Sequence, residues 1–107
     1  MVDRIAILIS YDTKTNKFES LYERNKFYRG LFGFNQRVKK KNKIYDYRTE
    51  GLFDRIPHIK VEDSVFIIAE KYIREMEQYF NEWGNKVKFN TFRVLLGDKR
   101  WREINVE

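Results

Sequence analysis

The residues with the clearest chemical potential lie in one segment, residues 24–48, where cations alternate with aromatic side chains. This segment, RNKFYRGLFGFNQRVKKKNKIYDYR, holds nine basic residues and a single acid, Asp46. Its net charge of +8 exceeds the +6 of the whole chain of 107 residues, so the rest of the chain is slightly acidic. Clustered cations attract anionic partners and supply much of the affinity for a phosphate backbone. The segment therefore predicts a surface that binds a polyanion.

Six cations and two tyrosines of this segment form the candidate binding set. Lysines at a hairpin tip reach a phosphate backbone, and arginines fork onto phosphate oxygens. Two interpretations of the tyrosines stay open: they stack on unpaired bases, as aromatic side chains do in RNA-binding domains, or they face the core. For the lysines, the alternative is a solvated edge hairpin that resists aggregation. The set is Arg37, Lys39, Lys40, Lys41, Lys43, Tyr45, Tyr47 and Arg48.

The rest of the sequence offers no motif for a cofactor, a metal or a nucleophile. Its five glycines are too scattered for a phosphate-binding loop. Without cysteine it has no disulfide, thiolate or zinc-finger site. His58 is the only histidine, and a loop position beside Pro57 is a simpler interpretation than a metal or general-base role. We therefore expect no cofactor and no bound metal, and a non-enzymatic role is favoured.

Asp12 is the one acid in a suggestive position, at the carboxyl end of a predicted first strand. The run ILISYD, residues 7–12, resembles the small CRISPR adaptation subunits and their virulence-associated relatives, whose first strand ends in a similar Tyr-Asp pair. The resemblance implies a ferredoxin-like dimer in which paired aspartates hold a divalent metal for nucleic-acid cleavage. The long segment from Phe34 to Lys60 departs from the compact middle of that family. A turn carboxylate near a helix is the alternative role of Asp12.

Apolar periodicity predicts two helices and three strands around this basic segment. Residues 18–32 and 70–83 each carry one apolar stripe at steps of three and four, typical of a helix that packs on a single sheet face. The stripe of the first helix is predicted at Phe18, Leu21, Tyr22, Asn25, Tyr28, Leu31 and Phe32. Residues 4–11, 64–68 and 87–96 are predicted strands.

The basic segment itself predicts a β-hairpin over residues 34–48. A two-residue turn at Lys41-Asn42 or Asn42-Lys43 joins its strands. In either register, alternation with period two puts Val38 on one face with Tyr45 and Tyr47. The opposite face then carries Arg37, Lys39, Ile44, Asp46 and Arg48.

The predicted order of strand, helix, hairpin, strand, helix and strand favours an α+β fold. Two strand-helix-strand units with right-handed crossovers give a ferredoxin-like sandwich, an antiparallel sheet with two helices on one face and an elongated middle β-hairpin. We expect one α+β domain over residues 1–96 and a charged C-terminal tail over residues 97–107. Residues 49–62, broken by Gly51 and Pro57, are the least regular part.

These features predict a small cytoplasmic protein that binds nucleic acid, with RNA or single-stranded DNA favoured. No stretch approaches the roughly 18 apolar residues of a membrane span, so no membrane partner is expected. Two alternatives remain from the sequence. One is a metal-dependent, nuclease-like homodimer that uses Asp12, and the other is a protein-interaction module whose basic hairpin meets an acidic partner.

Overall fold

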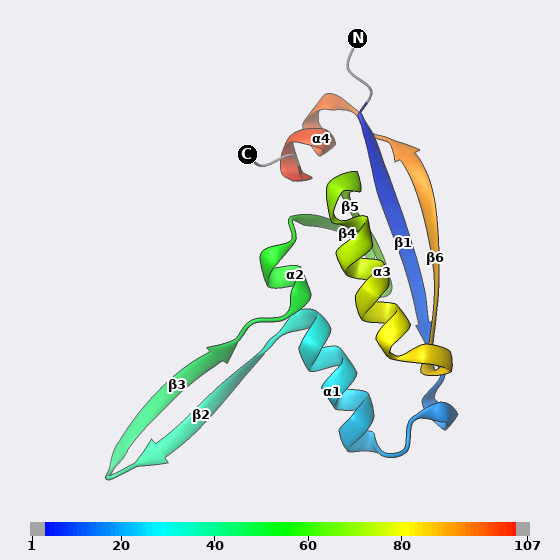
Figure 1. Ribbon diagram of the computed structural model, residues 1–107. Coiled ribbons are helices and arrows are strands. Elements are labelled where there is room, and N and C mark those ends of the chain that lie inside the picture. Colours follow the sequence, from blue (N-terminus) through cyan, green and yellow to red (C-terminus); the bar gives the residue numbers. More distant parts are fainter. Residues whose placement is uncertain (1–3, 105–107) are drawn as a thin grey trace.

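The computed structural model describes residues 4–104 and shows an α+β fold with a four-stranded antiparallel sheet, a separate two-stranded hairpin and four α-helices (Figure 1). The strands are β1 (Ile5–Thr13), β2 (Phe34–Lys40), β3 (Lys43–Thr49), β4 (His58–Glu62), β5 (Val65–Ala69) and β6 (Val87–Leu95). The helices are α1 (Leu21–Phe32), α2 (Leu52–Arg55), α3 (Ile73–Glu82) and α4 (Asp98–Ile104), with 3-10 turns η1 (Thr15–Lys17), η2 (Glu70–Tyr72) and η3 (Gly84–Lys86). No helix within this range is both long enough and apolar enough to cross a membrane.

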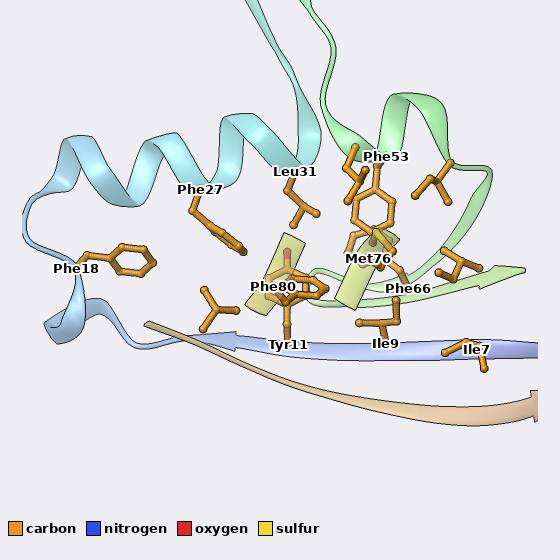
Figure 2. Close-up of a cluster of buried hydrophobic side chains, with 14 residues drawn as sticks. Ile7, Ile9, Tyr11, Phe18, Phe27, Leu31, Phe53, Phe66, Met76 and Phe80 are labelled. Carbon is orange, nitrogen blue, oxygen red and sulfur yellow. The ribbon is translucent and has the colours of Figure 1, made fainter. Parts of the chain in front are cut away.

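The four-stranded sheet has the order β4-β5-β1-β6, and every neighbouring pair is antiparallel. Strand β1 lies inside the sheet, as its continuous apolar run predicts. Successive side chains of a strand point to opposite faces. Ile7, Ile9 and Tyr11 are therefore buried on the face that α1 and α3 cover (Figure 2), whereas Ala6 points to the other face.

The main core lies between this sheet face and the two long helices. Phe27 and Leu31 of α1 and Met76 and Phe80 of α3 are at most 1% exposed. Phe27 contacts the rings of several neighbours, with ring centroids 6.1 Å from Tyr11. Burying an aromatic side chain of this size stabilises a fold by roughly 1.5–3 kcal/mol relative to leaving it exposed.

The buried stripe of α1 differs from the one predicted by the sequence. Ser20 caps the helix, because its hydroxyl accepts a hydrogen bond from the Glu23 amide (3.1 Å), and α1 therefore begins at Leu21. Phe18 packs into the core from the segment before the helix. The prediction was wrong for Leu21 and Tyr22, which are 68% and 74% exposed, and for Asn25, which is also exposed. It also omitted Phe27.

Residues 58–62 form a strand that the sequence did not predict. β4 pairs with β5 from His58 opposite Ile68, with an irregularity between Lys60 and Glu62. It fills the edge of the sheet, so the hairpin β2–β3 is not part of that sheet. Only a few alternating residues follow Pro57, and the irregular pairing hides the period-two signal.

The C-terminal segment is a helix that packs on the second face of the sheet. Ile104 of α4 is fully buried in a small cluster with Ala6 and Ala69. Arg4 also forms an ion pair with Asp98 at the start of α4. Helices thus lie on both faces of the sheet, where the sequence predicted two on one face. Residues 105–107 of the predicted tail lie outside the described residues.

The hairpin β2–β3 projects from the rest of the molecule (Figure 1). Lys41 and Asn42 form its turn, with φ of 48° and 68°. Positive φ at both positions is the geometry of a type I′ turn, and this is one of the two turns that the sequence predicted. The radius of gyration is 16.4 Å, against about 13 Å for a compact chain of this length, and the longest dimension is 59 Å.

Candidate nucleic-acid interface

The hairpin joins the rest of the molecule, here called the body, at a place where the backbone at Gly33 touches the backbone at Gly51. We call this place the root of the hairpin. Gly33, with φ of 78°, precedes β2, and Gly51 follows β3. A Cβ added to Gly51 would collide with the backbone at Gly33 and Phe32. Glycine at both positions is therefore what allows the two ends of the hairpin to cross at this point.

Arg48 fastens this root. Its guanidinium donates to both carboxylate oxygens of Asp54 (2.7 and 2.6 Å) and to the Phe32 carbonyl oxygen (3.0 Å). The same Asp54 carboxylate accepts a hydrogen bond from the Gly51 amide (2.8 Å). The hydrogen bond from Arg48 contributes most, and the one from Gly51 contributes next, to holding the pKa of Asp54 below its ordinary value. Arg48 therefore positions the hairpin relative to α2.

One face of the hairpin carries the two tyrosines. In the observed register Val38 lies opposite Tyr45 and Gln36 opposite Tyr47, so these four side chains share a face, as the sequence predicted for Val38 and the tyrosines. Tyr45 and Tyr47 are 40% and 48% exposed, and their rings stack with centroids 6.3 Å apart. They lie outside both core clusters, which decides the open question of their orientation in favour of solvent.

The four lysines of the hairpin surround its tip and are all exposed. Lys40 lies opposite Lys43 beside the turn at Lys41, and Lys39 lies opposite Ile44 on the other face. Within residues 4–104 none of these lysines forms an ion pair with a carboxylate. Their ammonium groups are therefore free to contact an external anion.

Arg37 is placed differently from the lysines, because it has a carboxylate partner. Its Nε donates to Asp46 Oδ1 across the hairpin (3.1 Å), and both side chains remain more than 70% exposed. Exposed pairs of this kind stabilise a protein by about 0–1 kcal/mol, so an incoming phosphate can compete for the guanidinium. The structure brings together all eight predicted residues on one hairpin, with Arg37 and Arg48 already paired.

A groove lies at the base of the tyrosine face, between α1 and α3. It encloses about 800 Å³ and is lined by aromatic side chains from three elements: Tyr22, Phe34, Tyr79 and Trp83. The Arg29 guanidinium lies over the Phe34 ring, 4.8 Å from its centroid. This groove was not predicted from the sequence, because Tyr22 was assigned to the core. The aromatic residues at the ends of both helices were the available signal.

Two further contacts order the groove. Lys86 Nζ donates to Glu23 Oε1 (2.6 Å), and this bond is the main reason that the pKa of Glu23 lies below its ordinary value. The Tyr79 hydroxyl donates a hydrogen bond to the Phe27 carbonyl oxygen (2.6 Å), and burial raises the pKa of Tyr79 to about 12. Tyr79 therefore stays protonated and keeps α3 fixed against α1 at neutral pH.

Asp12 lies apart from this interface. Its carboxylate accepts a hydrogen bond from Lys14 Nζ (2.8 Å), and β6 places Lys88 opposite it. Lys14 is the main reason that the pKa of Asp12 is lowered. Its side chain points to the sheet face opposite Tyr11, and no group of three potential metal ligands occurs in residues 4–104. These surroundings are those of a carboxylate held at a strand end.

His58 belongs to the core wall. Its Nδ1 lies 2.9 Å from the Ile56 carbonyl oxygen, and its ring packs 4.5 Å from the centroid of Phe53. Both contacts are structural. The loop position predicted from the sequence was wrong, because His58 is the first residue of β4 and pairs with Ile68.

Comparisons of the chain with protein-family models, curated proteins and solved structures gave no match.

Proposed function

We propose that this protein is a small, non-enzymatic nucleic-acid-binding protein of the cytoplasm that uses the hairpin β2–β3 as its binding element. RNA or single-stranded DNA is the favoured partner. One observation carries the proposal: four lysines without an ion pair in residues 4–104 and two exposed, stacked tyrosines lie together on one anchored, projecting hairpin.

The lysines supply affinity and the tyrosines supply the preference for single strands. Each phosphate that a lysine neutralises releases condensed counterions, so affinity falls as salt is added. Every base offers a π-face to an aromatic side chain, but only when the base is not already stacked in a duplex. Tyr45 and Tyr47 are exposed enough to make this contact.

The roles divide among the predicted residues according to their partners. Lys39, Lys40, Lys41 and Lys43 contact phosphates directly. Arg37 joins them by exchanging the exposed Asp46 carboxylate for a phosphate, whereas Arg48 holds the root. Arg48 therefore acts on binding through the position of the hairpin.

For the body we propose a ferredoxin-like sandwich, with the hairpin inserted between α1 and β4. The succession β1, α1, β4, β5, α3, β6 and the sheet order β4-β5-β1-β6 support this assignment. The body then serves as a stable platform, and its fold by itself specifies no activity.

A salt-titrated binding assay with single-stranded and duplex RNA and DNA tests the function. The four lysine contacts alone predict, on a single strand, a slope of about −3 for log affinity against log salt, which is roughly a 50-fold loss between about 50 and 200 mM. A contact by Arg37 steepens this slope by up to about 0.7. Single strands should bind more tightly than duplexes, because only they expose stackable bases.

The decisive variant replaces Lys39, Lys40, Lys41 and Lys43 by Ser. A matched control replaces four exposed cations of the body instead: Lys17, Arg74, Lys99 and Arg102. Both variants carry the same net charge, so a site on the hairpin predicts loss of binding only in the first. Equal losses of binding in the two variants would show that the net charge of the protein, and not the hairpin, determines the affinity, which would contradict the proposal. Binding by the hairpin variant at wild-type strength would also overturn it.

A further inference from the structure

The tyrosine face of the hairpin runs without a break into the groove between α1 and α3. Phe34 lies opposite Thr49, and alternation puts this pair on the same face as Tyr47 and Tyr45. Phe34 and Thr49 also line the groove. From Tyr45 to Thr49 the strand rises about 14 Å, which is the length of roughly four stacked nucleotides.

Charge is divided unequally along this surface. The hairpin tip carries lysines that have no carboxylate partner among the described residues, whereas the groove walls carry three cations and three acids. These are Lys26, Arg29, Lys86, Glu23, Glu50 and Glu82, and the Lys86–Glu23 ion pair neutralises two of them. A phosphate is thus favoured at the tip, while the groove suits an uncharged, aromatic group.

We propose that the groove between α1 and α3 binds one unpaired nucleobase of the strand that lies along the hairpin. This inference rests on the proposed function and adds a second site to it. The volume of about 800 Å³ lies within the range of small-ligand pockets. Tyr22, Phe34 and Trp83 provide the stacking surfaces.

The acids of the groove give this pocket a chemical preference. Glu50 and Glu82 form no ion pair within residues 4–104, so their carboxylates are available as hydrogen-bond acceptors. A carboxylate accepts from the exocyclic amino groups of cytosine, adenine and guanine, which thymine and uracil lack. A strand with one amino-bearing base at an end therefore binds more tightly than a strand of thymines alone.

Trp83 allows this pocket to be tested separately from the hairpin. The chain has two tryptophans, and Trp101 lies on α4 in the cluster on the other sheet face. In a Trp101→Phe background, Trp83 emission reports on the groove, while the anisotropy of a labelled oligonucleotide reports total binding. The probes are eight-nucleotide thymine strands with cytosine or thymine at the 5′ or the 3′ end.

The inference predicts that Trp83 emission changes in step with anisotropy and that one cytosine-ended strand binds several-fold more tightly. Glu50→Gln or Glu82→Gln should reduce that preference. Saturating anisotropy with unchanged Trp83 emission would overturn the base pocket and leave the proposed function standing. No binding in either readout would overturn both.

Tyr22 provides a variant with a neighbouring control. Tyr22→Ala removes an aromatic wall of the groove from a side chain that is 74% exposed, so folding is preserved. It should weaken the cytosine-ended strand by roughly 5- to 150-fold, the range for one base stacked on an aromatic side chain. Leu21→Ala changes an equally exposed neighbour that does not line the groove and should stay within about twofold of wild type. Equal effects of the two changes would contradict the pocket.

Discussion

Aromatic side chains have opposite environments in the two regions of this protein. In the body, Phe27 and Phe66 are at most 2% exposed, whereas in the hairpin Tyr45 and Tyr47 are 40% and 48% exposed. A second layer of helices covers the body's sheet, but neither face of the hairpin has such a cover (Figure 1). An aromatic side chain on an uncovered strand remains accessible to a ligand, because no other element packs on it.

The two regions also differ in what holds them together. Burial of apolar surface stabilises the body. An isolated two-stranded hairpin is marginally stable in water, so this one depends on cross-strand pairs and on its root at Gly33, Gly51 and Arg48. Substitutions in the two regions should therefore differ in how strongly they change stability.

The largest effect on stability should come from the body. Phe27→Ala removes a side chain with no exposed surface and should lower the free energy of unfolding by ~3–5 kcal/mol, measured by chemical denaturation. Tyr45→Ala on the hairpin should change it by no more than about 0.5 kcal/mol while weakening binding to single strands. Comparable destabilisation by both changes would mean that the hairpin is part of the cooperative core.

A smaller effect is expected at the hairpin root. Gly51→Ala places a methyl group against the backbone at Gly33 and should destabilise the protein by ~1–3 kcal/mol. Gly97→Ala is the matched control, because a Cβ there meets no atom of residues 4–104 within 4 Å. Thermal melts of the two variants give the comparison, and a Gly51→Ala protein as stable as the Gly97→Ala protein would argue against a fixed crossing.

Acid should loosen the hairpin before it unfolds the body. The pKa of Asp54 is lowered in the folded state, so its contribution to stability is present above the ordinary carboxyl value of 3.8 and is lost as pH falls below it. Amide hydrogen exchange in β2 and β3 should therefore accelerate relative to β1 below about pH 4, after correction for the intrinsic rate.

Asp54→Asn should remove most of this difference, because the side chain at position 54 then no longer titrates. Its hairpin amides should already exchange faster at neutral pH, where the Arg48 ion pair is missing. Identical pH profiles of wild type and variant would show that another group controls the root.

The smallest effect is expected at the exposed pair between Arg37 and Asp46. Asp46→Asn should change stability by about 0–1 kcal/mol, because both side chains are more than 70% exposed. Because Asp46 no longer competes for it, the Arg37 guanidinium should make its phosphate contact fully, which steepens the salt dependence on a single strand by up to about 0.7. An unchanged slope would restrict the phosphate contacts to the lysines.

The hairpin was the part of the fold that the sequence predicted best. Its faces follow from alternation alone, so Val38, Tyr45 and Tyr47 could be grouped before their exposure was known. Local signals also predicted α3, whose apolar residues recur regularly between polar ones. The orientation of the tyrosines required the structure, because period two does not say which face is covered.

Features that depend on distant parts of the chain were not predicted. Whether Phe27 or Tyr22 is buried depends on where the Ser20 cap starts α1 and on how α3 lies against it. The groove combines α1 and the adjoining hairpin root with α3, which is far from both in the sequence. Helix α4 was not predicted for the same reason, because its buried residue Ile104 packs against strands from both ends of the chain.

The contact between Gly33 and Gly51 makes residues 34–50 a removable cassette. Because the chain leaves and re-enters the body at one place, a very short linker would bridge the gap after excision of the whole arm. The same geometry lets an arm of different length or composition be grafted onto the body without redesigning its core.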